Sequence, residues 1–443
     1  MRSKQLIVVV VSLLVVILSV SLAYFTTQII GDGKKVEVSS TNLQIVFTDT
    51  DGEIAGADIE PGWSATKTFT VKNDSKSEYK YNIVIKDLVN TFVTNGYLQY
   101  KINSTNSGYN MTEFKDVPKS ETAKDTILAY SVSIPVGVTQ SYTIEFRYAN
   151  DEDVDQGDDM GKVLKGTLFI TEGTEEPKLL SDVIISKSVT NEDGVYNENG
   201  YRYEGSDPNN YIQMEKTDGI KETWRIIGIF PDGENGENII RVRKVGYEKF
   251  PYDFGTVNHW PNSSMYISRS KIYSLINYKN TVNYKVYLGT TGSYSTLNAS
   301  EWYMTERGNT PGATAKDSYD SATSAIVSFG LIYPSDYGYA VLSSDCTRTI
   351  KLYNYNGTSA CHNNNWLYQG SNQWQWLITP SDGTTQCADD CHSFFVNPSG
   401  EINEIPDGII ERPLQGPYSP VMALKSDVVV IGKGTNDNPY VMN

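Results

Sequence analysis

After an uncharged N-terminal run, the chain shows short segments in which apolar and polar positions alternate. QSYTIEFRY (140–148) has an aromatic or aliphatic residue at every second position, and YKYNIVIKD (79–87) has the same pattern. Because successive side chains of a strand point to opposite faces, this period of two predicts half-buried β-strands. Turn-rich pieces such as DTDGE and EPGWS separate four further strand candidates: LQIVFT (43–48), TKTFTVKN (66–73), GYLQYKIN (96–103) and GTLFIT (166–171). This part of the chain is predicted to be an antiparallel β-sandwich.

From about residue 180 the pattern becomes mixed. The segments ETWRIIGIF (222–230) and KSDVVVIGKG (425–434) are largely apolar in their centres and predict strands. In NIIRVRKVG (238–246), aliphatic residues alternate with Arg241 and Arg243. That alternation predicts a strand whose arginine face is solvated.

One segment of this second part has a helical period. SRSKIYSLINY (268–278) places Ile272, Leu275 and Ile276 three and four positions apart, which predicts a helix with one apolar face. Long loops rich in Gly, Asn, Ser and Tyr connect the predicted elements. Strands, a helix and long loops together predict an α+β domain, and loops of such length usually carry function or need a covalent tie.

The uncharged N-terminal run, residues 6–25, is long enough to cross a membrane. Twenty helical residues at ~1.5 Å each span a hydrocarbon core of ~30 Å. Arg2 and Lys4 precede the run and favour a cytoplasmic N-terminus, so the remainder is predicted to be exported. Two interpretations remain open: an uncleaved membrane anchor, or a signal peptide that is cut after Ala23 in the sequence Ser-Leu-Ala.

Composition and linkers suggest three parts. The charged stretch EGTEEPKLLSD (172–182) separates two regions of different character, and six of the seven tryptophans follow residue 220. We therefore expect a signal peptide or membrane anchor over 1–30, a β-sandwich over 31–176 and an α+β domain over 177–443. The formal net charge of −16 excludes a typical nucleic-acid-binding protein, whose footprint is basic.

The four cysteines all lie in the last hundred residues. An even number in an exported chain predicts disulfides, and proximity favours the pairs Cys346–Cys361 and Cys387–Cys391. A nucleophilic Cys361 beside His362 is disfavoured, because neighbours in an extended chain point in opposite directions. A zinc site is also disfavoured, because the paired short Cys-x2-Cys knuckles are absent. No catalytic constellation and no metal site are predicted here.

An acidic loop, DEDVDQGDD, contains Asp151, Asp153 and Asp155 at alternate positions. Such oxygen-rich loops can bind calcium. The spacing departs from the EF-hand, since glycine falls at the seventh position and Lys162 occupies the place of the bidentate Glu. We therefore interpret the segment as a solvated loop, with calcium as the weaker alternative.

The first part of the chain resembles the TasA/camelysin family of exported Gram-positive proteins over roughly residues 1–172. The resemblance rests on LAYFT, IEPGWSATKTFTVKNDSKSEYKYNIVI and SYTIEFRYANDEDVDQGDDMGKVLKGTLFIT. It implies a jelly-roll or immunoglobulin-like sandwich at the cell surface or in the biofilm matrix, and some members form fibres. The peptidase activity described for one branch lacks its ligands here, because residues 1–258 contain neither His nor Cys.

The second part resembles a domain of unknown function found in surface proteins of gut Firmicutes, over about 260 residues. The motifs occur in one order: YRYEGSDPNNYIQM, WRIIGIF, GLIYPSDYGYA, NNNWL, WQWLITPSDG, SFFVNPSGEI and VMALKSDVVVIGKGTNDNPYVM. That domain is similar to the C-type-lectin-like group, which includes formylglycine-generating-enzyme-like domains, and this implies a C-type-lectin-like fold. The stretch ERPLQGPYSPVMALKS departs from the family by an insertion of about six residues.

The segment CHNNNWLYQGSNQWQWLITP (361–380) combines amide and aromatic side chains. Amides bond hydroxyl groups and aromatic faces stack on sugars or partner side chains, so the segment is the predicted ligand-binding loop. Trp374 and Trp376 fit a buried strand, and Trp366 is a further core candidate. The predicted ligand-binding residues are therefore Asn363, Asn364, Asn365, Tyr368 and Asn372.

These observations predict a binding protein and not an enzyme. The sandwich acts as a stalk and the lectin-like domain binds an extracellular glycan or protein, either secreted or at the outer side of the membrane of a Gram-positive-type bacterium. Residues 6–25 hold the chain in the membrane if they are not cleaved. The alternative is a structural biofilm-matrix fibre protein that assembles with itself through the β-sandwich.

Overall fold

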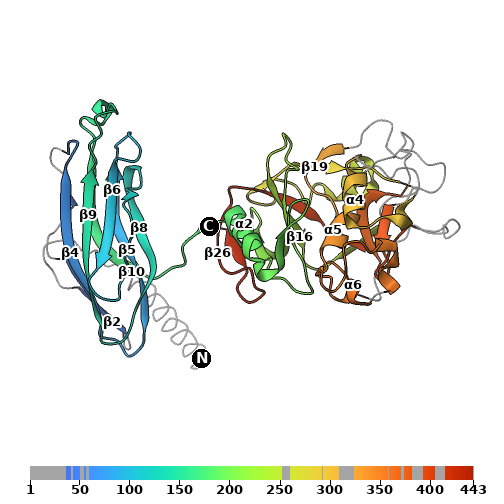
Figure 1. Cartoon of the computed structure of the whole chain (residues 1–443), viewed down its shortest axis with the longest axis horizontal. Coiled ribbons are helices and arrows are strands. Elements are labelled where there is room, and N and C mark those ends of the chain that lie inside the picture. The colour runs from blue at the N-terminus through green and yellow to red at the C-terminus, as the bar shows by residue number, and fades with distance from the viewer. Residues whose placement is uncertain are drawn as a thin grey trace, which may run out of the picture. The chain divides into compact units, whose positions relative to one another are not determined.

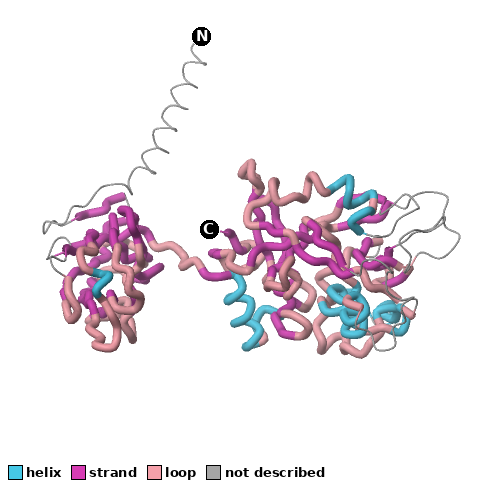
Figure 2. The backbone as a smooth tube through the Cα atoms, turned by 90° about the horizontal axis from the view of Figure 1, so that it is seen from above, coloured by secondary structure: helices cyan, strands magenta, loops and turns pink. Residues whose placement is uncertain are grey.

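The computed structural model describes residues 36–40, 43–49, 54–55, 59–251, 260–291, 293–308, 324–357, 359–370, 374–381, 393–404 and 415–442. The chain divides into two compact units, Met1–Glu176 and Pro177–Asn443, which we call the first and second units (Figure 1). Strands predominate in both units, so the β-rich architecture is confirmed (Figure 2). No helix within these described ranges is long and apolar enough to span a membrane. The apolar run 6–25 lies outside the described residues.

The first unit consists of two antiparallel sheets with one shared hydrophobic core. The six-stranded sheet has the order β1-β2-β4-β9-β6-β7, and the four-stranded sheet has the order β3-β10-β5-β8. The strands are β1 (Val36–Ser40), β2 (Leu43–Asp49), β3 (Ile54–Ala55), β4 (Ser64–Asn73), β5 (Tyr79–Asn90), β6 (Leu98–Ser104), β7 (Lys115–Asp116), β8 (Ser120–Ile134), β9 (Thr139–Tyr148) and β10 (Leu164–Glu172). One short 3-10 helix, η1 (Gly157–Asp159), forms the end of the acidic loop.

The apolar residues that alternate with polar ones in the sequence are the residues that form this core. Along β9, Tyr142, Ile144, Phe146 and Tyr148 are all 2% exposed or less, and the residues between them are half-buried. All six predicted strands of this part are present. The long strand β8 was not predicted, because its first residues, SETAKD, are polar and exposed and carry no alternation.

The second unit is built on a ten-stranded sheet. Eight strands have the order β11-β26-β27-β14-β15-β16-β25-β18, and in addition β13 pairs with β15 and β12 pairs with β13. All its pairs are antiparallel except β14 with β27. The strands are β11 (Lys178–Leu179), β12 (Val195–Asn197), β13 (Tyr201–Tyr203), β14 (Tyr211–Glu215), β15 (Lys221–Phe230), β16 (Ile239–Lys244), β18 (Thr281–Val282), β25 (Val421–Lys425), β26 (Val429–Ile431) and β27 (Tyr440–Met442).

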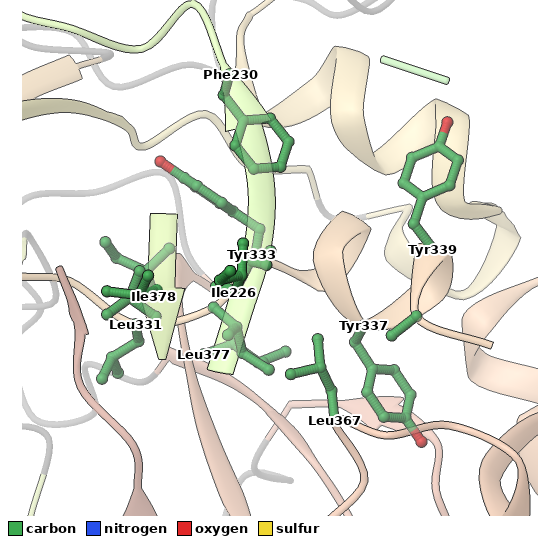
Figure 3. Close-up of a cluster of buried hydrophobic side chains, with 14 of the residues drawn as sticks. Ile226, Phe230, Leu331, Tyr333, Tyr337, Tyr339, Leu367, Leu377 and Ile378 are labelled. Atoms are coloured by element: carbon green, nitrogen blue, oxygen red, sulfur yellow. The ribbon is translucent and has the colours of Figure 1, made fainter. Parts of the chain in front are cut away.

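Short sheets and helices complete the second unit. The small sheets pair β17 (Glu248–Pro251) with β24 (Gln415–Tyr418), β19 (Tyr284–Tyr287) with β20 (Ser324–Val327), and β21 (Gln375–Pro380) with β22 (Ser393–Val396) and β23 (Ile402–Asn403). The helices are α2 (Leu180–Thr190), α3 (Ser264–Arg269), α4 (Ala299–Glu306), α5 (Pro334–Tyr339) and α6 (Ser359–Asn363), with 3-10 turns η2 (Glu192–Gly194), η3 (Trp260–Asn262), η4 (Tyr294–Thr296) and η5 (Leu352–Gly357). Figure 3 shows part of the shared core.

The predicted helix over 268–278 is wrong. Helix α3 ends at Arg269, and the following residues form turns. Ile276 is 80% exposed, so the apolar spacing does not mark a buried face. The segment is instead held by two aromatic residues: Tyr273 and Tyr278 are buried, with ring centroids 6.4 Å and 5.6 Å from that of Trp224. Aromatic packing on the sheet therefore overrides the local helical period.

The solvated face predicted for residues 238–246 is also wrong. The segment does form strand β16, but Arg241 and Arg243 are only 1% and 4% exposed. Strand β16 lies inside the sheet, between β15 and β25, and its arginine face is covered by later parts of the chain. This buried arginine face positions the candidate site.

Candidate ligand-binding site

The disulfide Cys346–Cys361 is confirmed. Both cysteines are buried, and the bond ties the loop around residue 346 to helix α6. Cys361 is therefore not available as a thiolate nucleophile. The second predicted pair, Cys387–Cys391, lies outside the described residues.

The structure separates the predicted amide ligands. Asn363 is exposed at the end of α6, and the Asn364 side chain donates to the Asp345 carboxylate at 2.8 Å. Asn365 is only 4% exposed, and it donates to the Tyr337 carbonyl at 2.7 Å while accepting from a backbone amide. Both ends of the Asn365 side chain thus hold the fold together, and we do not retain it as a ligand contact. Asn372 lies outside the described residues.

Tyr368 is half-buried and already has a hydrogen-bond partner. Its hydroxyl donates to the Pro398 carbonyl at 2.6 Å, and its ring lies edge-on to the His362 ring with centroids 5.2 Å apart. Only part of the ring remains for a ligand. Replacement by alanine is therefore expected to lower stability as well as any binding.

The tryptophans of this segment differ in exposure. Trp366 and Trp376 are each 6% exposed, as expected for core residues. Trp374 is 43% exposed, so its prediction as a core residue is wrong. Strand β21 begins only at Gln375, and Trp374 precedes it with its ring 4.7 Å from the Phe395 ring. An exposed indole supported by a second aromatic ring is available for stacking.

The sequence did not indicate a cluster of buried charges around Asp336, in the first turn of α5. Its carboxylate accepts from Arg202 Nη1 at 2.9 Å and from Arg241 Nη1 and Nη2 at 3.0 and 2.8 Å. It also accepts from the Tyr333 amide at 3.1 Å, which caps the helix. Burial by itself would raise the pKa of Asp336, but the guanidinium groups of Arg241 and Arg202 hold it below its usual value.

Glu306 extends this cluster. It is fully buried and accepts from the Ser335 amide and hydroxyl at 2.9 and 2.6 Å. Burial raises the pKa of Glu306 to about 8, although Arg307 at 3.6 Å opposes the rise. Arg307 also lies 3.3 Å from the buried Asp232. We call these three arginines and three acids the Asp336 cluster: Arg202, Asp232, Arg241, Glu306, Arg307 and Asp336. Asp232 and Asp336 compensate the arginines, because Glu306 is protonated below its raised pKa.

A second set of arginines is compensated only in part. In the register of β15 with β16, Arg225 lies directly opposite Arg243, so two like charges form a cross-strand pair. Two like charges directly opposite each other destabilise a sheet unless groups of opposite charge or hydrogen-bond acceptors lie beside them. We call Arg225 and Arg243 the arginine pair.

Arg225 has partners on several sides. Its guanidinium lies 4.2 Å from the Tyr211 ring centroid and 4.8 Å from that of Trp366. It donates to the Asn210 side chain at 2.7 Å and lies 2.9 Å from the carboxylate of Asp207, which is 64% exposed. Arg225 is thus neutralised by an acid at the surface.

Arg243 has no acidic partner among the described residues. Its Nη2 donates to Ser419 Oγ at 2.9 Å, the amide of Gln369 lies against the guanidinium as an acceptor, and Nε is buried without a partner. Burial, and then the charge of Arg225, lower the pKa of Arg243 to about 9. In the sequence, Arg243 belongs to the triplet Arg241-Val242-Arg243, which follows two isoleucines. An apolar strand with two arginines on one face is the pattern that could have indicated buried charges.

Asp151 and Asp155 of the acidic loop accept hydrogen bonds from groups of the first unit. Asp151 accepts from the Tyr97 hydroxyl at 2.8 Å and from the Asp153 amide at 3.0 Å, and Asp155 accepts from the Gly157 amide at 2.9 Å. Nowhere in the part of the chain that the structure describes do three His, Cys, Asp or Glu side chains converge as metal ligands. The carboxylates of this loop stabilise its turns.

Comparison with known proteins found no match: no family model, no curated protein and no solved structure matches this chain.

Proposed function

We propose that this chain is an extracellular binding protein in which the first unit is a stalk and the second unit presents the ligand-binding surface. The proposal includes export through the apolar run 6–25, to the cell surface or beyond, in a Gram-positive-type bacterium. It also includes an immunoglobulin-like first unit related to TasA and camelysin, and a C-type-lectin-like second unit. The ligand is an extracellular glycan or protein.

The observation that carries this proposal is the buried Cys346–Cys361 disulfide, whose second cysteine lies two residues before the exposed Asn363. Disulfides persist in oxidising compartments, which supports export. The bond also restrains the segment that precedes Asn363, Asn364 and the exposed Trp374. Restraint before binding lowers the entropic cost of ordering a recognition loop.

A stalk is favoured over a fibre subunit by the edge strand β8. Residues 121–125 of this strand are exposed and include Glu121, Lys124 and Asp125. Charged residues on an edge strand oppose pairing with another sheet edge. Assembly of the sandwich through this edge is therefore unfavourable, and the fibre alternative would need another contact.

A binding array with glycans and extracellular proteins tests the proposal, followed by variants of the exposed tryptophan. Trp374→Ala should weaken binding of an identified ligand by ~1–3 kcal/mol, as for a surface hot-spot residue, with little change in the melting temperature. Val189→Ala is the matched control, because Val189 is 80% exposed on α2 and lies outside the candidate surface.

Two results would contradict the proposal. A ligand that binds equally well to a fragment ending at residue 176 would place recognition in the first unit. Filaments that grow with protein concentration, together with no ligand on the array, would favour the fibre alternative.

A further inference from the structure

We propose that the arginine pair is an anion site, in which Arg243 receives the carboxylate of an acidic sugar at the position now taken by the Gln369 amide. This inference rests on the proposed binding function and names the chemistry of the ligand. It starts from a contrast within one strand: Arg241 and Arg243 lie two residues apart on the same face of β16, but their surroundings differ.

Arg241 is compensated and Arg243 is not. Arg241 donates two hydrogen bonds to Asp336, at 3.0 and 2.8 Å, and lies 3.9 Å from Asp232. Arg243 is also buried, but its described partners are one hydroxyl and one amide, and it faces the like charge of Arg225. A buried charge without a counter-ion strongly destabilises a fold. The simplest purpose of such a charge is to bind a counter-ion that is supplied from outside.

The geometry suits a carboxylate. A guanidinium presents its N–H groups in a planar fork that matches the two oxygens of a carboxylate. With its amide oriented so that the oxygen faces Arg243, Gln369 accepts from Nη1 and Nη2 through this single oxygen, whereas a carboxylate would offer one oxygen to each group. Ser419 Oγ, 2.9 Å from Nη2, adds a hydroxyl beside the same fork.

The Gln369 side chain is able to leave this position. Gln369 is only half-buried, and the residue after it, Gly370, has a φ of +96°. Apart from its own chain neighbours, no described atom lies within 4 Å of the place where a Cβ of Gly370 would be, so no described segment packs on that side of the residue after Gln369. A neutral amide is also a weaker acceptor for a guanidinium than a carboxylate. A carboxylate that reaches Arg243 should therefore displace it.

The surroundings favour a sugar acid over a polyanion. The half-buried Tyr211, whose ring lies 4.2 Å from the Arg225 guanidinium, supplies an aromatic face of the kind that contacts sugar rings. The chain carries a net charge of −16, which repels a polyanion but tolerates a single carboxylate on an otherwise neutral glycan.

The experiment uses the full-length chain in detergent, with glucuronic acid as the probe, glucose as the neutral control and an acetylated dipeptide as a carboxylate without a sugar ring. Calorimetry should show binding of glucuronic acid and not of glucose. Gln369→Glu should place an internal carboxylate on Arg243, so this variant should melt at a higher temperature and lose at least tenfold in affinity for the probe. Gln369→Leu is the matched neutral control and should keep the affinity.

A second variant separates binding from structure. Arg243→Met should abolish probe binding without lowering the melting temperature, because it removes an uncompensated charge. A melting temperature lowered as far as that of Arg241→Met would make Arg243 a structural residue and overturn the inference. An unchanged melting temperature and affinity in Gln369→Glu would also overturn it.

The probe results distinguish this inference from the proposed function. If glucuronic acid does not bind but an array ligand binds through Trp374, the anion site fails and the binding function stands. If glucuronic acid binds through Arg243 while no array ligand depends on Trp374, the anion site stands and the proposed surface fails. Equal affinity for the acetylated dipeptide would overturn the assignment to a sugar.

Discussion

Replacement of Asp336 by Asn tests whether the Asp336 cluster holds α5 on the sheet. The carboxylate accepts three hydrogen bonds from two buried guanidinium groups, those of Arg202 and Arg241, at 2.8–3.0 Å. Loss of one partner of a buried ion pair costs ~3–5 kcal/mol, because the other charge remains buried without compensation. At about 2–4 °C per kcal/mol for a unit of this size, a loss of about 4 kcal/mol lowers the melting temperature by roughly 8–16 °C.

Thermal and urea unfolding of the Asp336→Asn protein, followed by circular dichroism, would measure this loss. Asp345→Asn is the matched control, because Asp345 is exposed and its change should stay within about 0.5 kcal/mol. A shift in Asp336→Asn no larger than in this control would refute the reasoning that the charges are buried and mutually dependent. Because the folded-state pKa of Asp336 lies below 3.8, its stabilisation is present above that pH and is lost as the pH falls through the lowered value.

Two further predictions concern stability. Cys361→Ser should destabilise the second unit by ~3 kcal/mol, the chain-entropy value for a closed loop of 15 residues. Reducing conditions should lower the urea midpoint of the variant less than that of the unchanged protein. Equal midpoints for the two conditions in the unchanged protein would contradict a stabilising bond. Glu306 has a folded-state pKa of about 8 against an ordinary 4.5, so its contribution to stability falls as the pH rises from 4.5 to 8. Glu306→Gln should flatten that part of the pH–stability curve, and an unaltered slope would show that Glu306 does not titrate there.

Much of the first unit was predictable from the sequence alone. Successive side chains of a strand such as β9 point to opposite faces of the sheet. The alternating apolar residues of QSYTIEFRY therefore indicated both the strand and its buried side chains. The disulfide Cys346–Cys361 followed from the even number of cysteines and their proximity. Strand β8 was not predicted, because its polar first half has no alternation of apolar and polar residues.

The candidate site was predictable only in part. The sequence located an amide-rich segment, but it did not distinguish the exposed Asn363 from the buried Asn365, two residues apart. A single turn at the end of α6 directs one outward and the other towards Tyr337. Trp374 was misassigned for a similar reason, since the strand begins one residue later.

The sequence by itself determined the local structure of this protein: the alternating strands, the charged stretch at 172–182, and the cysteines close enough to pair. Only the tertiary structure decided that the arginine face of β16 is buried as well as its aliphatic face. Alternation is the same whether Arg241 and Arg243 face water or protein, and the answer depends on segments far along the chain. Asp336, 95 residues after Arg241, neutralises that arginine, while Ser419, 176 residues after Arg243, supplies only a hydroxyl. Local patterns contain no information about such distant partners, because burial and charge compensation are set by contacts that form only when the whole unit has folded.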